Sequence, residues 1–108
     1  MKKIEAEVRK EMFPRVDYAL KQIGVSGLTV AEERRAGRGM WSYPTENVKR
    51  LILTVVVEDS GVRKVVESIR GSATTGSWGD GRIAVSTVEH AFDIGSGLTD
   101  RNELAIPA

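Results

Sequence analysis

The chain is poor in the residues on which most catalytic and metal sites depend. Its 108 residues include no cysteine and a single histidine, His90. Without cysteine there can be no disulfide, thiol nucleophile or thiolate metal ligand, and one histidine leaves little scope for a histidine-based triad or metal site. We therefore expect that the protein is not an enzyme and has no catalytic residues, no metal site and no prosthetic group.

The sequence also lacks a strong charge bias and any long apolar run. Its formal net charge is +1, which gives no reason to expect nucleic acid as a partner. No apolar run approaches the roughly eighteen residues of a membrane span, and Met1 leads directly into charged sequence, so we expect a cytoplasmic protein without membrane insertion. The length of 108 residues predicts one domain, over residues 1–108, that buries its own core.

Hydrophobic periodicity predicts six elements before the tail. Period-two alternation, or a short apolar run, predicts strands at residues 2–10, 27–35, 48–58 and 82–88. Helical spacing predicts one helix over 13–24, with Pro14 in its first turn and Gly24 at its end. It predicts a second helix over 58–71, capped by Asp59 or Ser60.

The order of these elements is β-α-β-β-α-β, which predicts an α+β fold of the ferredoxin-like class. In that fold both helices lie on one face of an antiparallel sheet, and the first and third strands are central. Leu28 and Val30 of the second strand are expected to point inward. The pattern after residue 88 is weaker, and indicates a helical turn at 89–92 and an extended piece at 103–106.

The third predicted strand is apolar on both faces. Leu51, Leu53, Val55 and Val57 lie on one face of this strand, and Ile52 and Val56 lie on the other. Helices that cover one face of the sheet would leave Ile52 and Val56 in water, unless another subunit covers them. The strand therefore favours an oligomer.

The stretch "TTGSWGDGRIAV", residues 74–85, has three glycines within six residues, directly before a predicted strand. One interpretation is a flexible turn. The other is an anion cradle, in which side chains are absent where a ligand approaches the backbone and free N–H groups face the anion. The spacing G-x-x-G-x-G is neither the dinucleotide fingerprint nor the Walker loop, so it does not choose between them.

Three stretches of the chain together resemble the PII signal-transduction family, the trimeric nucleotide-binding regulators of nitrogen and carbon metabolism. They are "MKKIEA" at the start, "GVSGLTV" at 24–30 and "ATTGSWGDGRIAV" at 73–85. The third is the most specific, because the family has T-G-x-x-G-D-G-[KR]-I before its fourth strand. The resemblance implies a homotrimer that binds an adenine nucleotide (ATP, ADP or AMP) as effector between its subunits.

The resemblance also implies site residues. The expected nucleotide-binding residues are Thr29, Gly37, Arg38, Thr75, Gly76, Gly79, Asp80, Gly81 and Arg82. The large loop between the second and third strands, the T-loop, falls at about residues 36–48, and its Met40, Trp41 and Tyr43 are the expected contacts to a target. That target, a transporter or enzyme, is not identified by the sequence. Trp41 and Tyr43 could equally pack on their own subunit, and Trp78 could serve packing or ligand contact.

The chain departs from the family pattern in three places. Gly39 replaces a glutamine that serves Mg-ATP and 2-oxoglutarate binding, Asp93 and Gly95 in "DIGSG" replace two arginines, and the T-loop is shortened. Losing two cations and gaining an anion should reduce the advantage of ATP over ADP. Losing the glutamine should leave 2-oxoglutarate weakly bound. Two alternatives therefore stay open: a carbon-metabolism variant that binds ADP or AMP with a small anion such as bicarbonate, and a structural trimer of the CutA kind without a nucleotide site.

Overall fold

The computed structural model describes residues 1–32, 49–92 and 94–95. It has four strands, two α-helices and two short 3₁₀ turns in the described ranges. In chain order these are β1 (Lys2–Arg9), η1 (Lys10–Met12), α1 (Phe13–Gln22), β2 (Thr29–Glu32), β3 (Arg50–Val57), η2 (Asp59–Gly61), α2 (Val62–Ala73) and β4 (Gly81–Thr87).

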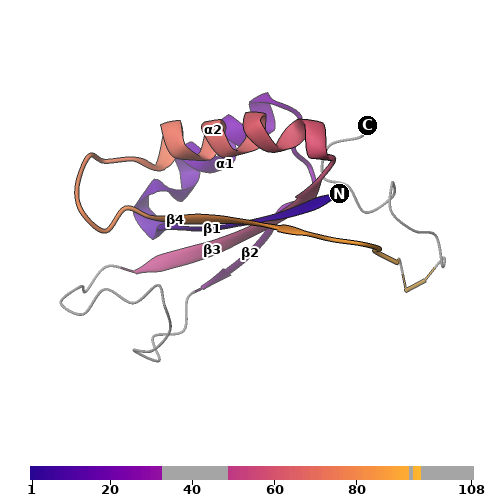
Figure 1. Ribbon diagram of the computed structural model, residues 1–108. Helices are drawn as coiled ribbons and strands as arrows, with labels where there is room; N and C mark the ends of the chain where they lie inside the picture. The colour runs from indigo at the N-terminus through magenta and orange to yellow at the C-terminus, as the bar shows by residue number, and fades with distance from the viewer. Residues whose placement is uncertain (33–48, 93, 96–108) are drawn as a thin grey trace.

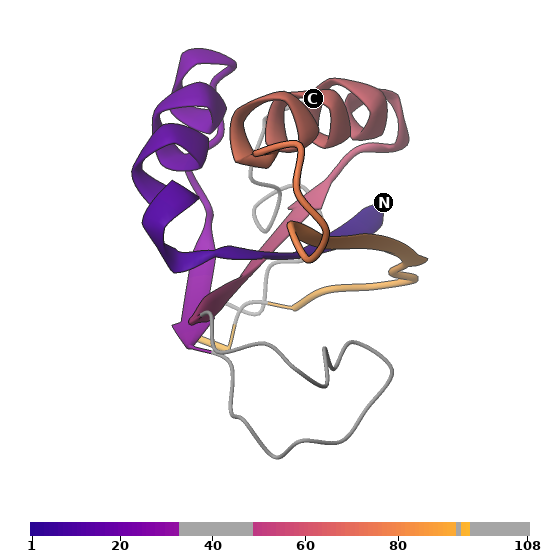
Figure 2. The same ribbon diagram turned by 90° about the vertical axis from the view of Figure 1, so that its left-hand side faces the viewer.

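The four strands form one antiparallel sheet in the order β2-β3-β1-β4, so the prediction that the first and third strands are central is confirmed. Both helices lie on the same face of this sheet (Figure 1). In the view turned by 90°, the described elements place no helix on the opposite face (Figure 2). The predicted ferredoxin-like βαββαβ fold is confirmed, and we call the side of the sheet opposite the helices the outer face.

The core lies between the sheet and the two helices. Alternate residues of β1 and β3 point into it, and the register places Ile4 opposite Val55 and Ala6 opposite Leu53. The helices contribute apolar residues at helical spacing, as their sequence pattern predicts. The buried residues of this core are Ile4, Ala6, Val8, Val16, Leu20, Val25, Leu51, Leu53, Val55, Val57, Val65, Ile69 and Ala73.

The end of α1 confirms its sequence signal. Gly24 has φ 92°, and its N–H donates to the carbonyl of Lys21 at 3.1 Å, while the N–H of Val25 donates to the carbonyl of Leu20 at 3.0 Å. This pair of bonds is the Schellman motif, which uses a glycine in the left-handed conformation to satisfy the last carbonyls of a helix.

The predicted cap of α2 by Asp59 or Ser60 is wrong. The residue before α2 is Gly61, and no side chain caps the helix there. Asp59 and Ser60 instead lie in the 3₁₀ turn η2. The carboxylate of Asp59 accepts a hydrogen bond from the amino terminus of Met1 at 2.8 Å, and a charged donor is a stronger partner than a helix N–H.

The edge strand and the tail also differ from expectation. β2 begins at Thr29, two residues later than predicted. Leu28 packs against the core, and Val30 pairs with the core residue Leu53 and so points to the helix side of the sheet, as expected, but it keeps 42% of its surface exposed. The helical turn expected at 89–92 is absent: residues 88–91 form no helix or strand, and Phe92 makes an isolated bridge. The N–H of Val88 donates to the carbonyl of Met1 at 3.0 Å. The extended piece expected at 103–106 lies outside the described residues.

Candidate functional site

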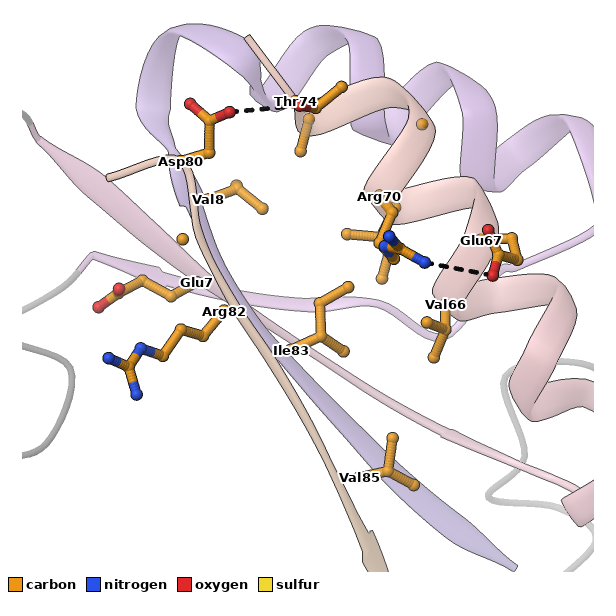
Figure 3. A pocket seen from close by; sticks show the side chains of 14 residues that line it. Glu7, Val8, Val66, Glu67, Arg70, Thr74, Asp80, Arg82, Ile83 and Val85 are labelled. Atoms are coloured by element: carbon orange, nitrogen blue, oxygen red, sulfur yellow. Dashed lines mark hydrogen bonds and ion pairs between the residues drawn. The ribbon is translucent and has the colours of Figure 1, made fainter. Parts of the chain in front are cut away.

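The connection between α2 and β4, residues 74–80, is organised around one side chain, that of Asp80. We call this segment the glycine loop. The Asp80 carboxylate accepts hydrogen bonds from the backbone N–H of Thr75 at 2.7 Å and of Gly76 at 3.1 Å. It also accepts from the hydroxyls of Thr75 and Thr74, and Figure 3 shows the Thr74 bond. These bonds close the loop on itself, so it is not a free flexible turn.

The environment of Asp80 keeps its carboxyl group ionised. Partial burial tends to raise the pKa of Asp80, but hydrogen bonds from the Thr75 hydroxyl and N–H, from Arg9 and from the Gly76 N–H outweigh it. Together they lower the pKa from its usual 3.8 to about 2. The carboxylate is therefore charged at every pH at which the protein is expected to work.

Two arginines of the sheet attach the glycine loop to the strands. Arg9, at the end of β1, donates from Nε to Asp80 at 3.1 Å and from Nη2 to the carbonyl of Trp78 at 3.0 Å. Arg50, at the start of β3, donates from Nη2 to the carbonyl of Gly79 at 2.6 Å. Two successive carbonyls of the loop thus turn toward the strand ends.

Glycine is required at these positions of the α2–β4 connection for two different structural reasons. Gly76 and Gly79 have φ of 81° and 91°, the left-handed conformation that other residues rarely adopt. Gly81 has φ 126°, and a Cβ atom there would lie 1.8 Å from the carbonyl oxygen of Glu7. A side chain is therefore excluded at Gly81 by the backbone of β1, whereas the anion-cradle interpretation, one of the two left open by the sequence, assigns that absence to a ligand.

Arg82 lies on the outer face of the sheet. In the register of β1 and β4 it is opposite Glu7, and both side chains extend to the side of the strands away from Ile83 and Val66 (Figure 3). Glu7 is buried, with Arg50 Nε 3.9 Å from its Oε1. The Arg82 side chain is exposed and makes no ion pair with any residue in the described ranges.

A groove of about 690 Å³ lies on the other side of β4, between that edge strand and α2 (Figure 3). Its walls are mainly apolar, with Val66 and Ile69 from the helix and Ile83 and Val85 from the strand. The glycine loop closes one end of it through Thr74 and Asp80. Asp80 thus borders the groove, whereas Arg82 points to the opposite side of the sheet.

Thr29, the other expected ligand residue that the structure describes, lies far from the glycine loop. It is exposed, begins the edge strand β2 and pairs with Thr54 on β3. Since β2 and β4 are opposite edges of the sheet, three strand spacings or about 14 Å separate them. Within one chain, Thr29 and Arg82 do not form a single compact site.

The remaining expected site residues cannot be placed in this way. Gly37, Arg38, Met40, Trp41 and Tyr43, with the whole predicted T-loop, lie outside the described residues. Trp78, which the sequence left open between packing and ligand contact, keeps 70% of its surface exposed.

Sequence reasoning missed the arginines that hold the glycine loop. Arg9 and Arg50 both lie at strand ends next to lysines, in "RK" and "KR", which reads as an ordinary solvated end. The one available signal was their outward-facing position at the strand ends nearest the loop. That signal requires the sheet order, because Arg9 and Asp80 are 71 residues apart in the chain.

Comparison with known proteins decides the family. The model of the family "Nitrogen regulatory protein P-II" matches residues 1–97. The chain belongs to this family. One similar protein is the nitrogen regulatory protein P-II of Rhizobium meliloti, which is 36% identical over 107 aligned residues. The alignment covers 92% of this P-II chain and 96% of the relative. The nitrogen regulatory protein P-II of Microchaete diplosiphon is 38% identical over 105 residues, or 90% of this chain and 94% of the relative.

Solved structures give the same answer. The crystal structure of Arabidopsis thaliana PII bound to citrate superposes with a TM-score of 0.79 at 30% identity, covering 94% of this chain and 90% of that one. The family resemblance inferred from the glycine loop is thereby confirmed. P-II proteins are regulators, so a regulatory role is the functional class of this chain. No helix in the described ranges is both long and apolar enough to cross a bilayer.

Proposed function

We propose that this P-II protein is an adenine-nucleotide sensor whose binding sites form between the subunits of a homotrimer. The observation that carries the proposal is the glycine loop, which is held in a fixed shape next to an exposed arginine, Arg82. An arginine fork suits a polyphosphate because it donates several charge-assisted hydrogen bonds at once.

The backbone of the glycine loop supports this role. The carbonyls of Trp78 and Gly79 point toward Arg9 and Arg50. A trans peptide places its N–H opposite its C=O, and no peptide bond in the described chain is cis. The N–H groups of Gly79 and Asp80 therefore point away from the arginines, and successive amides of this kind form a concave anion-binding surface.

The positions of the two sheet edges support a site between subunits. Thr29 and Arg82 lie at opposite edges of the sheet, so one nucleotide meets both most readily when edges of two copies come together. The half-buried Ile52 and Val56 on the outer face favour that assembly, since apolar side chains there gain from cover by a second subunit.

The preferred nucleotide follows from the charges near the phosphates. With Asp93 and Gly95 in place of two family arginines, we infer that ATP has lost most of its advantage over ADP, and that AMP also binds. A small anion is a second effector class in this proposal, with bicarbonate favoured over 2-oxoglutarate because Gly39 offers no side-chain ligand to a metal. The Arabidopsis relative binds a small carboxylate, citrate, which shows that this fold can hold such a ligand.

The output of the sensor is proposed to run through the T-loop, with Met40, Trp41 and Tyr43 contacting a transporter or enzyme. The chain itself is proposed to have no catalytic activity. The alternative to a nucleotide sensor is a trimer that binds no nucleotide and serves assembly alone. This alternative predicts no nucleotide binding in the experiment that follows.

The experiment is calorimetric titration of the wild-type protein with ATP, ADP and AMP, repeated with Arg82→Gln. We expect binding by the wild type and about a tenfold or larger loss of ATP affinity in the variant, because a hydrogen bond to a charged group contributes roughly 1.5–3 kcal/mol. The matched control is Arg63→Gln, an exposed arginine of α2, which should bind as the wild type does. Absence of heat with all three nucleotides would favour the assembly-only alternative.

A further inference from the structure

We infer that the side chains of Asp80 and Arg9 are positioning groups of the glycine loop: the Asp80 carboxylate occupies the place of an internal anion and Arg9 neutralises it, so that neither side chain contacts the nucleotide. This inference rests on the proposed function, since it assigns roles within the same site. It differs from the expectation drawn from sequence, which placed Asp80, Thr75 and Gly76 among the groups that contact the ligand.

The first argument is the number of donors that Asp80 already serves. Oδ1 accepts from Arg9 Nε and the Thr75 hydroxyl, and Oδ2 accepts from the N–H groups of Thr75 and Gly76 and from the Thr74 hydroxyl. A carboxylate has about four lone-pair sites, so five donors saturate it. It has no capacity left for a ribose hydroxyl or a metal ion.

The second argument concerns the backbone N–H groups that donate to Asp80. The N–H groups of Thr75 and Gly76 are the amides that a glycine-rich loop would otherwise offer to a phosphate. Here they bind a carboxylate whose pKa is held at about 2, so the carboxylate keeps its charge and competes well for them. A phosphate is left with the amides on the other side of the loop, at Gly79 and Asp80, and with the Arg82 side chain.

The third argument concerns charge. A carboxylate beside a phosphate site would repel the ligand, by an amount that grows with the ligand's charge. The Arg9 Nε lies 3.1 Å from Asp80 Oδ1, and the two side chains are only 12% and 21% exposed. Because solvent screens such a pair poorly, Arg9 cancels most of the field of Asp80. Arg9 also binds the Trp78 carbonyl, so it links this neutralisation to the loop's shape.

The test combines amide hydrogen exchange with calorimetry on the full-length protein. In the free wild type, the amides of Thr75 and Gly76 should exchange slowly. In Asp80→Asn, which keeps the side-chain shape but removes the charge, both should exchange about tenfold faster or more, equivalent to roughly 1.4 kcal/mol. The same variant should weaken all three nucleotides because it loosens the loop, and it should weaken ATP least, because the unbalanced charge of Arg9 attracts the most highly charged ligand most.

Arg9→Met should change the affinities for ATP and AMP by different factors, which a purely structural role of Arg9 would not do. It leaves Asp80 charged and uncompensated, so ATP affinity should fall by at least about tenfold and AMP affinity by clearly less. Arg9→Lys should restore most of the ATP affinity. In the Asp80→Asn background Arg9→Met restores the charge balance of the pair, so the double variant should recover the wild-type ratio of ATP to AMP affinity.

The control is Asp59→Asn, which removes another hydrogen-bonded carboxylate far along the chain from the loop, and should leave both readouts unchanged. Unprotected amides at Thr75 and Gly76 in the wild type, or equal loss of ATP and AMP in Arg9→Met, would overturn the inference. So would tighter nucleotide binding by Asp80→Asn, which would make Asp80 a competitor of the ligand. If the wild type binds no nucleotide, the proposed function fails, while the exchange measurement still decides whether Asp80 organises the loop.

Discussion

At the scale of single residues, Asp80 has the largest influence on the proposed site. It satisfies amides and hydroxyls of its own loop, and it holds Arg9 in a fixed position at the end of β1. A sequence motif records only that an aspartate stands between two glycines. The structure adds that this aspartate faces inward, and that Arg82 is the charged group of the motif facing outward.

The depressed pKa of Asp80 predicts how its contribution to stability depends on pH. A carboxyl group whose folded pKa is below its unfolded value stabilises the fold above the unfolded pKa, here 3.8, and loses that effect as the pH falls through about 2. The difference corresponds to about 2 kcal/mol. Urea unfolding should therefore show Asp80→Asn destabilised by roughly this amount at pH 7, with the gap to wild type closing between pH 4 and pH 2. A gap independent of pH would contradict the assignment.

At the scale of elements, sequence and structure agree where local pattern is sufficient. The alternation in β1, the apolar run in β3 and the helical spacing of α1 and α2 are local patterns, so these elements and their order were predictable. The cap of α2 was not, because the Met1 amine that captures Asp59 is 58 residues away in the chain. The attachment of the glycine loop by Arg9 and Arg50 was hidden for the same reason: side-chain pairing across strands appears only when the sheet order is known.

The close approach of β4 to β1 at Gly81 gives a prediction for the sheet. Gly81→Ala would place a Cβ 1.8 Å from the Glu7 carbonyl oxygen, so the strands must separate at that end. We expect a loss of at least about 3 kcal/mol in the free energy of unfolding, with Arg82 displaced. The matched control is Gly71→Ala in α2, where nothing lies within 4 Å of the added atom, and alanine should stabilise the helix by about 0.5–1 kcal/mol. Equal stability of the two variants in chemical denaturation would contradict this account.

At the scale of the whole molecule, the sheet has helices on one side and an outer face on the other. That face combines the apolar Ile52 and Val56 with the charged Glu7, Arg50 and Arg82. Glu7 and Arg50 are buried there, whereas Arg82 is exposed. A surface of this kind suits a subunit interface, in which the apolar part is covered and Arg82 remains available to a ligand. The fold thus accounts for both the proposed assembly and the placement of the proposed sites at its subunit boundaries.

The assembly is tested by a charge on the outer face. Val56 pairs with Lys3 across β1 and β3, so Val56→Asp should fold with a lysine beside the new carboxylate. If the outer face is the interface, this variant should sediment as a monomer at micromolar concentration, while the wild type sediments as a trimer. Tyr18→Asp, at an exposed apolar residue of α1 on the opposite side of the molecule, should remain trimeric. A trimeric Val56→Asp would place the interface elsewhere.

The central claim, that each nucleotide site is built from two subunits, is tested most directly by mixed trimers. Thr29→Trp blocks one edge of the sheet and Arg82→Glu reverses the charge at the other, so trimers of either variant alone should bind no nucleotide. When the two variants are unfolded together and refolded as mixed trimers, a site between subunits recovers both native residues in about one quarter of random combinations. Calorimetry with ADP is then predicted to show binding at about one quarter of the wild-type number of sites, and mixed trimers without any regained binding would contradict the claim.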